Sequence, residues 1–150
     1  MKLQRDLQEF IALFNSHRVD YLLVGGHAVA FHGYPRYTGD IDFLVRPTEE
    51  NATRVLAALA DFGFGEMGLQ AREFIQPGQV IQLGRPPNRI DILTQISGVE
   101  FEEAWQGSIV TEIDGLPTRI LGREALLKNK RSIDRAKDRA DVEELLKIDS

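Results

Sequence analysis

The sequence predicts a single α+β domain over residues 1–150, and three observations support this fold class. The chain is 150 residues long and 43% apolar, which is enough for one sizeable hydrophobic core. Apolar residues recur at helical spacing near both ends, whereas the middle holds short apolar runs bounded by Gly, Pro and Asn. No internal repeat, low-complexity tract or long linker divides the chain.

Helices and short strands alternate in the first part of the chain. A stripe of apolar residues at helical spacing predicts an N-terminal amphipathic helix. Pro47 and Thr48 can start and cap a later helix, which Gly63 and Gly65 end. The elements predicted here are the opening helix with its stripe at Leu3, Leu7, Phe10, Ile11 and Phe14, a strand over residues 19–24, a short helix over 27–32, a strand over 41–46 and the helix capped by Thr48.

The middle of the chain is rich in β-structure and its end is helical. Pro77-Gly78 and Asp114-Gly115 are turn sequences between apolar runs, so each predicts a hairpin. The strands predicted here cover residues 74–75 with 80–83, then 89–96, then 109–113 with 116–121, and two helices over 123–131 and 134–147 close the chain.

The composition excludes several classes of protein. The chain has no cysteine, which rules out disulfides, Cys-ligated zinc, iron–sulfur clusters and a cysteine nucleophile. No apolar run approaches the ~18 residues of a membrane span, and no signal peptide is evident, so we expect a cytoplasmic protein without a membrane partner. The net charge of −5 argues against non-specific DNA binding. This charge is uneven, because residues 123–139 carry +4 and the other 133 residues carry −9.

Two predicted strands carry acidic residues between apolar neighbours. Side chains alternate along a strand, so Asp40 and Asp42 share one face, and Asp91 lies between two isoleucines on a later strand. Acids beside apolar surface are costly to desolvate unless a cation joins them, and oxygen-only ligation suits Mg²⁺. If the two strands are neighbours, the three carboxylates can hold one or two metal ions and orient a nucleoside triphosphate. The alternative is that these acids only cap turns and strand ends.

A glycine pair precedes these acids. A strand that ends in Gly25-Gly26 and opens a helix exposes backbone N–H groups that can bind phosphate, although such a pair is also typical of a tight turn. The order of this pair, Arg36-x-Thr38, Asp40-x-Asp42 and the later Asp91 resembles the nucleotidyltransferase superfamily, which has the polymerase-beta-like fold. More narrowly, residues 21–146 resemble small stand-alone bacterial nucleotidyltransferases related to abortive-infection toxins.

The resemblance implies a mixed, mostly antiparallel sheet flanked by helices, with the active site on one face. It implies that Asp40, Asp42 and Asp91 are the catalytic acids and metal ligands, and that Gly25 and Gly26 contact the triphosphate. Many superfamily members have Gly-Ser in place of this glycine pair. We expect no accessory domain of the kind with which larger members choose their acceptor.

Further polar residues are candidates for substrate binding. Arg36 suits a bidentate contact with phosphate, and its alternative is a surface position in a loop. Thr38 is a second candidate from the same loop. Its alternative is a hydrogen bond within that loop. Lys128 and Lys130 match the Lys-rich helix of the family and could reach the triphosphate, with a solvated helix face as the alternative.

The remaining charged residues have structural interpretations. His27 and His32 lack the spacing of two zinc ligands, so we expect ordinary hydrogen-bonded histidines. Lys137 and Asp141 are four residues apart, which predicts a surface ion pair. Asp138 falls on the apolar face of the last helix and needs a cationic partner there. The candidates for that partner are Lys128, Lys130 and Arg135.

The leading hypothesis is Mg²⁺-dependent transfer of a nucleoside monophosphate from a triphosphate such as ATP to a hydroxyl acceptor, with release of pyrophosphate. The base stays open, and so does the acceptor, which is a protein, a tRNA or other RNA, or a small molecule. The alternative is a non-catalytic nucleotide-binding or interaction domain, for example one component of a toxin–antitoxin pair. A homodimer and a toxin–antitoxin partner are both compatible with the sequence.

Overall fold

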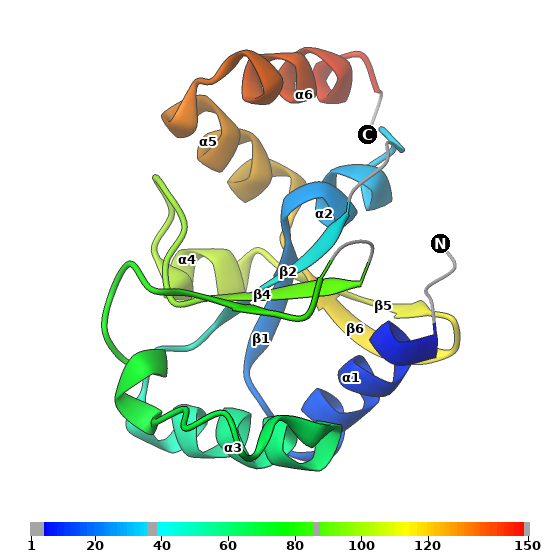
Figure 1. The fold of residues 1–150 in the computed structure, drawn as a ribbon. Coiled ribbons are helices and arrows are strands. Elements are labelled where there is room, and N and C mark those ends of the chain that lie inside the picture. The colour runs from blue at the N-terminus through cyan, green and yellow to red at the C-terminus, as the bar shows by residue number, and fades with distance from the viewer. Residues whose placement is uncertain (1–4, 36–38, 86–87, 149–150) are drawn as a thin grey trace.

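The computed structural model describes residues 5–35, 39–85 and 88–148, which form a six-stranded mixed sheet with helices on both faces (Figure 1). The strands lie in the order β3-β4-β2-β1-β6-β5. β2 is parallel to β4 and β1 is parallel to β6, whereas the other three neighbouring pairs are antiparallel, so the sheet is mixed and mostly antiparallel, as predicted. The strands are β1 (Tyr21–Val24), β2 (Asp40–Val45), β3 (Val80–Leu83), β4 (Arg89–Leu93), β5 (Ile109–Ile113) and β6 (Leu116–Ile120).

Different helices cover the two faces of the sheet. In Figure 1, α1 and α3 lie below the sheet, and α2, α5 and α6 lie above it. In the part of the chain that the structure describes, no helix is long and apolar enough to cross a membrane. The helices are α1 (Arg5–Ser16), α2 (Gly25–Phe31), α3 (Glu49–Leu59), the π-helical turn η1 (Ala60–Phe64), the 3₁₀ turn η2 (Ala71–Phe74), α4 (Phe101–Gln106), α5 (Arg123–Ile133) and α6 (Ala136–Leu146).

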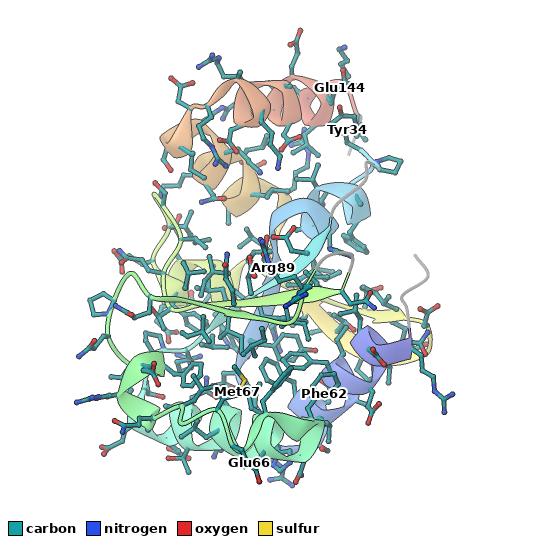
Figure 2. All side chains as sticks on the ribbon, viewed as in Figure 1. Tyr34, Phe62, Glu66, Met67, Arg89 and Glu144 are labelled. Carbon is teal, nitrogen blue, oxygen red and sulfur yellow. The ribbon has the colours of Figure 1, made fainter. Side chains whose placement is uncertain are left out.

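An aromatic cluster fills the space between the sheet and α1. Phe43 of β2 lies 5.2 and 5.5 Å from the ring centroids of Phe10 and Phe14 of α1. Phe62 of η1 is on the same side of the sheet in Figure 2, and its ring meets that of Phe10 edge-on at 5.2 Å. Full burial of each such side chain stabilises the fold by about 1.5–3 kcal/mol, so the face of β2 that carries Phe43 packs against the hydrophobic core. The acidic side chains of β2 consequently point to the opposite face.

Two predictions about local turn and cap chemistry are confirmed. Asp114 and Gly115 join β5 to β6 with φ angles of +52° and +79°, which match the twist of a tight hairpin. Thr48 caps α3, because its Oγ1 accepts a hydrogen bond from the backbone N–H of Asn51 at 3.3 Å. Both signals act within a few residues and therefore do not depend on the rest of the fold.

The strand predicted at residues 74–75 is wrong, because this segment belongs to η2 and the turn after it. A capping box forms there, in which the N–H of Gln70 donates to Glu73 Oε2 at 2.7 Å. Phe74 is fully buried at the end of η2, which explains its apolar character without a strand. β3 pairs with β4 instead, and β4 ends at Leu93 rather than at Ile96.

Candidate active site

Three carboxylates converge on the face of the sheet that points toward α2. β2 and β4 run side by side with Asp40 opposite Arg89 and Asp42 opposite Asp91, so all four side chains lie on one face. One ligand oxygen from each of Asp40, Asp42 and Asp91 lies within 4.8 Å of the others. We call these three residues the acid triad. The convergence expected from the sequence is therefore present.

Gly25 allows the backbone to approach the acid triad closely. It has a φ of +66°, and a Cβ built at this position would lie 2.1 Å from Asp42 Oδ2. Only glycine fits such a contact without moving the carboxylate. The first glycine of the pair after β1 is thus explained by its proximity to Asp42, not only by the turn that it makes.

The acid triad carries an unfavourable concentration of charge. Burial and the neighbouring Asp40 and Asp91 carboxylates raise the pKa of Asp42 to about 8. Burial also raises the pKa of Asp91, although hydrogen bonds from Arg89 oppose that effect. A bound cation would relieve both costs, because it favours the ionised carboxylates.

A cavity of about 360 Å³ opens beside the acid triad. Asp40 and Asp42 line it, whereas Asp91 is buried behind them with 8% of its side chain exposed. The described residues that line it also include three cations of α5, α6 and the turn between them, Lys130, Arg135 and Lys137, which we call the basic wall. The remaining lining residues are Val24, Gly25, Gly26, Leu93, Gln95, Ile96, Ser97, Asn129 and Ile133.

Lys130 connects the basic wall to two buried acids of α6. Its Nζ lies 3.2 Å from Asp138 Oδ1 and 3.1 Å from Asp141 Oδ2, and all three residues are buried. Arg135 adds a hydrogen bond from its Nε to Asp138 Oδ2 at 2.7 Å. The expected cationic partner of Asp138 is therefore supplied by Lys130 and Arg135. The predicted surface pair of Lys137 with Asp141 is wrong, because the packing of α5 on α6 buries Asp141 against Lys130.

The other candidates from the sequence are placed differently. Lys128 forms an ion pair with Glu103 of α4 at 2.8 Å, and it is not among the described residues that line the cavity. His32 is an ordinary hydrogen-bonded histidine, as expected, because its Nε2 donates to the carbonyl of Leu121 at 2.8 Å. Arg36 and Thr38 lie outside the described residues.

The expectation for His27 is met only in part, because the ring has a hydrogen bond with the backbone of Asp40 but one ring nitrogen has no partner among the described residues. Its Nδ1 is buried without a hydrogen-bond partner among the described residues. Burial lowers the pKa of His27, although the nearby Asp40 carboxylate opposes this effect. His27 thus lies next to the acid triad in its neutral form near neutral pH.

The comparisons with known proteins agree on one fold. The sequence matches no family model and no curated protein sequence. Among solved structures, a Thermotoga maritima protein assigned to the nucleotidyltransferases superposes with a TM-score of 0.62 at 16% identity, over 95% of this chain and 91% of its own. The lincosamide antibiotic adenylyltransferase LnuA, with lincomycin bound, gives a TM-score of 0.60 at 16% identity, over 99% of both chains.

The antibiotic-resistance factor ANT(2″)-Ia, in complex with adenylyl-2″-tobramycin, gives a TM-score of 0.55 at 18% identity, over 93% of this chain and 84% of its own. The chain has the nucleotidyltransferase fold. At these identities the likeness establishes the fold alone, so the chemistry has to be argued from the residues of the site.

Several residues of this nucleotidyltransferase-fold site escaped sequence reasoning. Arg89 contacts two acids of the triad, and its position two residues before Asp91 on a strand was the signal that could have found it. Gln95 and Ser97 line the cavity from the loop after β4, and Asn129 lines it from α5. No local pattern marks these three residues, because only the packing of α5 against that loop brings them together.

The donor set of the acid triad fits a hard divalent cation. Three carboxylates offer oxygen ligands only, and the cavity of about 360 Å³ that Asp40 and Asp42 line has room for phosphate oxygens and water. The increase in the pKa of Asp42 to about 8 is expected for such a cluster of carboxylates when no cation is bound.

Proposed function

We propose that this protein transfers a nucleoside monophosphate from a nucleoside triphosphate to a hydroxyl acceptor and releases pyrophosphate. The observation that carries the proposal is the acid triad beside a cavity whose other side is the basic wall. A triphosphate complexed with a divalent cation needs both negative and positive side chains around it, because carboxylates hold the cation and cationic side chains neutralise phosphate oxygens. The nucleotidyltransferase fold supports the same reaction class.

Each part of the site has a role in this proposal. The acid triad would hold Mg²⁺, which supplies charge neutralisation on the triphosphate during the reaction. The glycine pair lets phosphate groups come close to the backbone, and the basic wall, in which Asp138 and Asp141 hold Lys130, would face the phosphates from the other side of the cavity. The acceptor oxygen forms a bond to the α-phosphorus while the bond to the pyrophosphate oxygen breaks. Asp91 would assist either in binding the metal or in taking the hydroxyl proton as general base.

The acceptor is proposed only as a hydroxyl compound. LnuA with lincomycin and ANT(2″)-Ia with adenylyl-2″-tobramycin are small-molecule cases on this fold. A protein hydroxyl and a tRNA end are the other acceptor classes. A homodimer and a complex with a toxin–antitoxin partner would present such an acceptor to the active site in different ways.

Transfer of label from nucleotide to acceptor tests the proposal. The full chain is incubated with each α-³²P-labelled triphosphate, Mg²⁺ and three acceptor pools, namely aminoglycosides and lincosamides, total tRNA, and soluble protein. We expect the wild type to label one pool and Asp42→Ala to lose at least about 100-fold in rate. Asp61→Ala is the matched control, because this exposed acid of η1 pairs with His17 on the other side of the sheet. Equal labelling by wild type and Asp42→Ala would contradict the proposal.

A further inference from the structure

Arg89 lies at the start of β4 (Figure 2) and contacts two acids of the triad. Its Nε donates to Asp91 Oδ1 at 2.9 Å, and its Nη2 donates to Asp91 Oδ2 and to Asp40 Oδ2, both at 3.0 Å. One guanidinium group therefore engages both oxygens of Asp91 and one oxygen of Asp40. Because both oxygens of Asp91 are engaged, any oxygen with which Asp91 would bind a metal ion already accepts a hydrogen bond from Arg89.

The backbone fixes this arrangement. Arg89 lies opposite Asp40 in the parallel register of β2 and β4, and two residues before Asp91 on the same face of β4. The guanidinium consequently lies within hydrogen-bond distance of both carboxylates. A guanidinium group keeps its proton at any pH at which the protein is handled, so the positive charge of Arg89 is permanent.

The charge count explains why such a residue is needed. Three carboxylates lie within 4.8 Å of one another, and their mutual repulsion opposes folding when no cation is bound. One arginine compensates a single negative charge. The side chain of Arg89 is 29% exposed, whereas that of Asp91 is 8% exposed, so the guanidinium has solvent to move into and the carboxylate does not.

We propose that Arg89 is an internal counter-ion of the acid triad, which holds Asp40 and Asp91 together in the metal-free protein and competes with a divalent cation for them. This inference rests on the proposed function, because it requires that the triad binds a divalent cation. Arg89 is a positioning residue in this proposal. It sets the affinity for the cation, and it keeps the triad assembled between rounds of nucleotide binding.

The opposite role would be that Arg89 orients the carboxylates for the metal and so strengthens binding. The two roles predict opposite signs when the charge is removed. A positive charge one hydrogen bond away from two ligands disfavours a second cation there, and in a partly buried site this repulsion exceeds the loss of one orienting contact. Removal of the charge should therefore tighten metal binding.

Mn²⁺ affinity of the full-length chain tests the inference. Free Mn²⁺ is measured by electron paramagnetic resonance for wild type, Arg89→Gln, Arg89→Lys and the control Arg54→Gln, whose residue pairs with Glu50 on α3. We expect Arg89→Gln to bind Mn²⁺ about tenfold tighter or more than wild type. We expect Arg89→Lys and Arg54→Gln to stay within about threefold of wild type, because the first keeps the charge and the second is remote.

Thermal unfolding gives a second readout that works even if Arg89→Gln is unstable. In EDTA, Arg89→Gln should melt below wild type, and saturating Mn²⁺ should raise its melting temperature by more than it raises that of wild type. If wild type binds Mn²⁺ and Arg89→Gln binds equally or more weakly, the inference is overturned and the proposed function stands. If wild type and Asp42→Ala both bind no Mn²⁺, with or without a non-hydrolysable ATP analogue, the proposed metal site fails and this inference fails with it.

Discussion

Lys130→Met tests whether the basic wall is held by buried ion pairs. The ammonium group of Lys130 lies 3.2 Å from Asp138 Oδ1 and 3.1 Å from Asp141 Oδ2, and the side chains of both acids are at most 2% exposed. Methionine keeps most of the volume but leaves two buried carboxylates with Arg135 as the remaining contact of Asp138. Removal of one partner from such a network costs about 3–5 kcal/mol, so we expect the free energy of unfolding to fall by about 3–4 kcal/mol.

Urea unfolding near neutral pH measures this loss. The control is Lys147→Met, because Lys147 is exposed and pairs with Glu144 at 3.1 Å, and we expect a change below about 0.5 kcal/mol. The double variant Lys130→Met/Asp141→Asn should recover part of the lost stability, since it removes one of the two buried carboxylates that lose their contact with Lys130. The reasoning is refuted if Lys130→Met stays within about 1 kcal/mol of wild type, or if the double variant is no more stable than the single one.

The same network predicts a pH dependence. Burial alone would raise the pKa of Asp138, but hydrogen bonds from Arg135 and Lys130 outweigh it, and the pKa is lowered. A lowered carboxyl pKa contributes stability that is present above the unfolded value of about 3.9 and is lost as the pH falls through the folded value. Wild type should therefore lose stability below about pH 4, and Asp138→Asn should lose less over the same range, as measured by urea unfolding.

Three further predictions concern the site and its surroundings. The pKa of Asp42 is raised to about 8, so ionisation of this carboxyl destabilises the metal-free protein. The free energy of unfolding in EDTA should therefore fall between about pH 5 and pH 8, by up to about 1.4 kcal/mol per pH unit. Asp42→Asn should flatten this slope, as measured by urea titrations. Gly25→Ala should weaken Mn²⁺ binding at least about tenfold, because its Cβ would lie 2.1 Å from Asp42 Oδ2; unchanged affinity would contradict the close approach. Asn51→Ala should cost about 2–3 kcal/mol in unfolding experiments without changing Mn²⁺ affinity, since its amide bonds the backbone of Asp20 and Arg46 at the far end of β1.

The parts of the fold that depend on local chemistry were predictable from the sequence. The alternation along β2 placed Asp40 and Asp42 on one face, and the turn at Asp114-Gly115 defined its hairpin. The convergence of Asp91 with these acids could be stated only as a condition, because it depends on the pairing of β2 with β4. Strands that are about fifty residues apart in the chain leave no local mark of their register.

The errors have physical causes of the same kind. The segment at residues 74–75 combines apolar residues with a following Pro-Gly turn, and its capping box outweighed strand propensity. Helical spacing suggested that Lys137 partners Asp141, but spacing along α6 carries no information about α5, from which Lys130 reaches Asp141. Arg89 was missed for a similar reason, since its role depends on Asp40 of the neighbouring strand.

The proposed function depends most directly on joint binding of a nucleoside triphosphate and a divalent cation at the acid triad. Calorimetric titration of a non-hydrolysable ATP analogue into the full chain, with Mg²⁺ and with EDTA, tests this dependence in wild type, Asp42→Ala and the control Asp61→Ala. We predict binding by wild type and Asp61→Ala that requires Mg²⁺, and binding by Asp42→Ala that is at least about tenfold weaker. Nucleotide binding of equal strength in EDTA, or by Asp42→Ala, would contradict the assignment of the acid triad as the metal site.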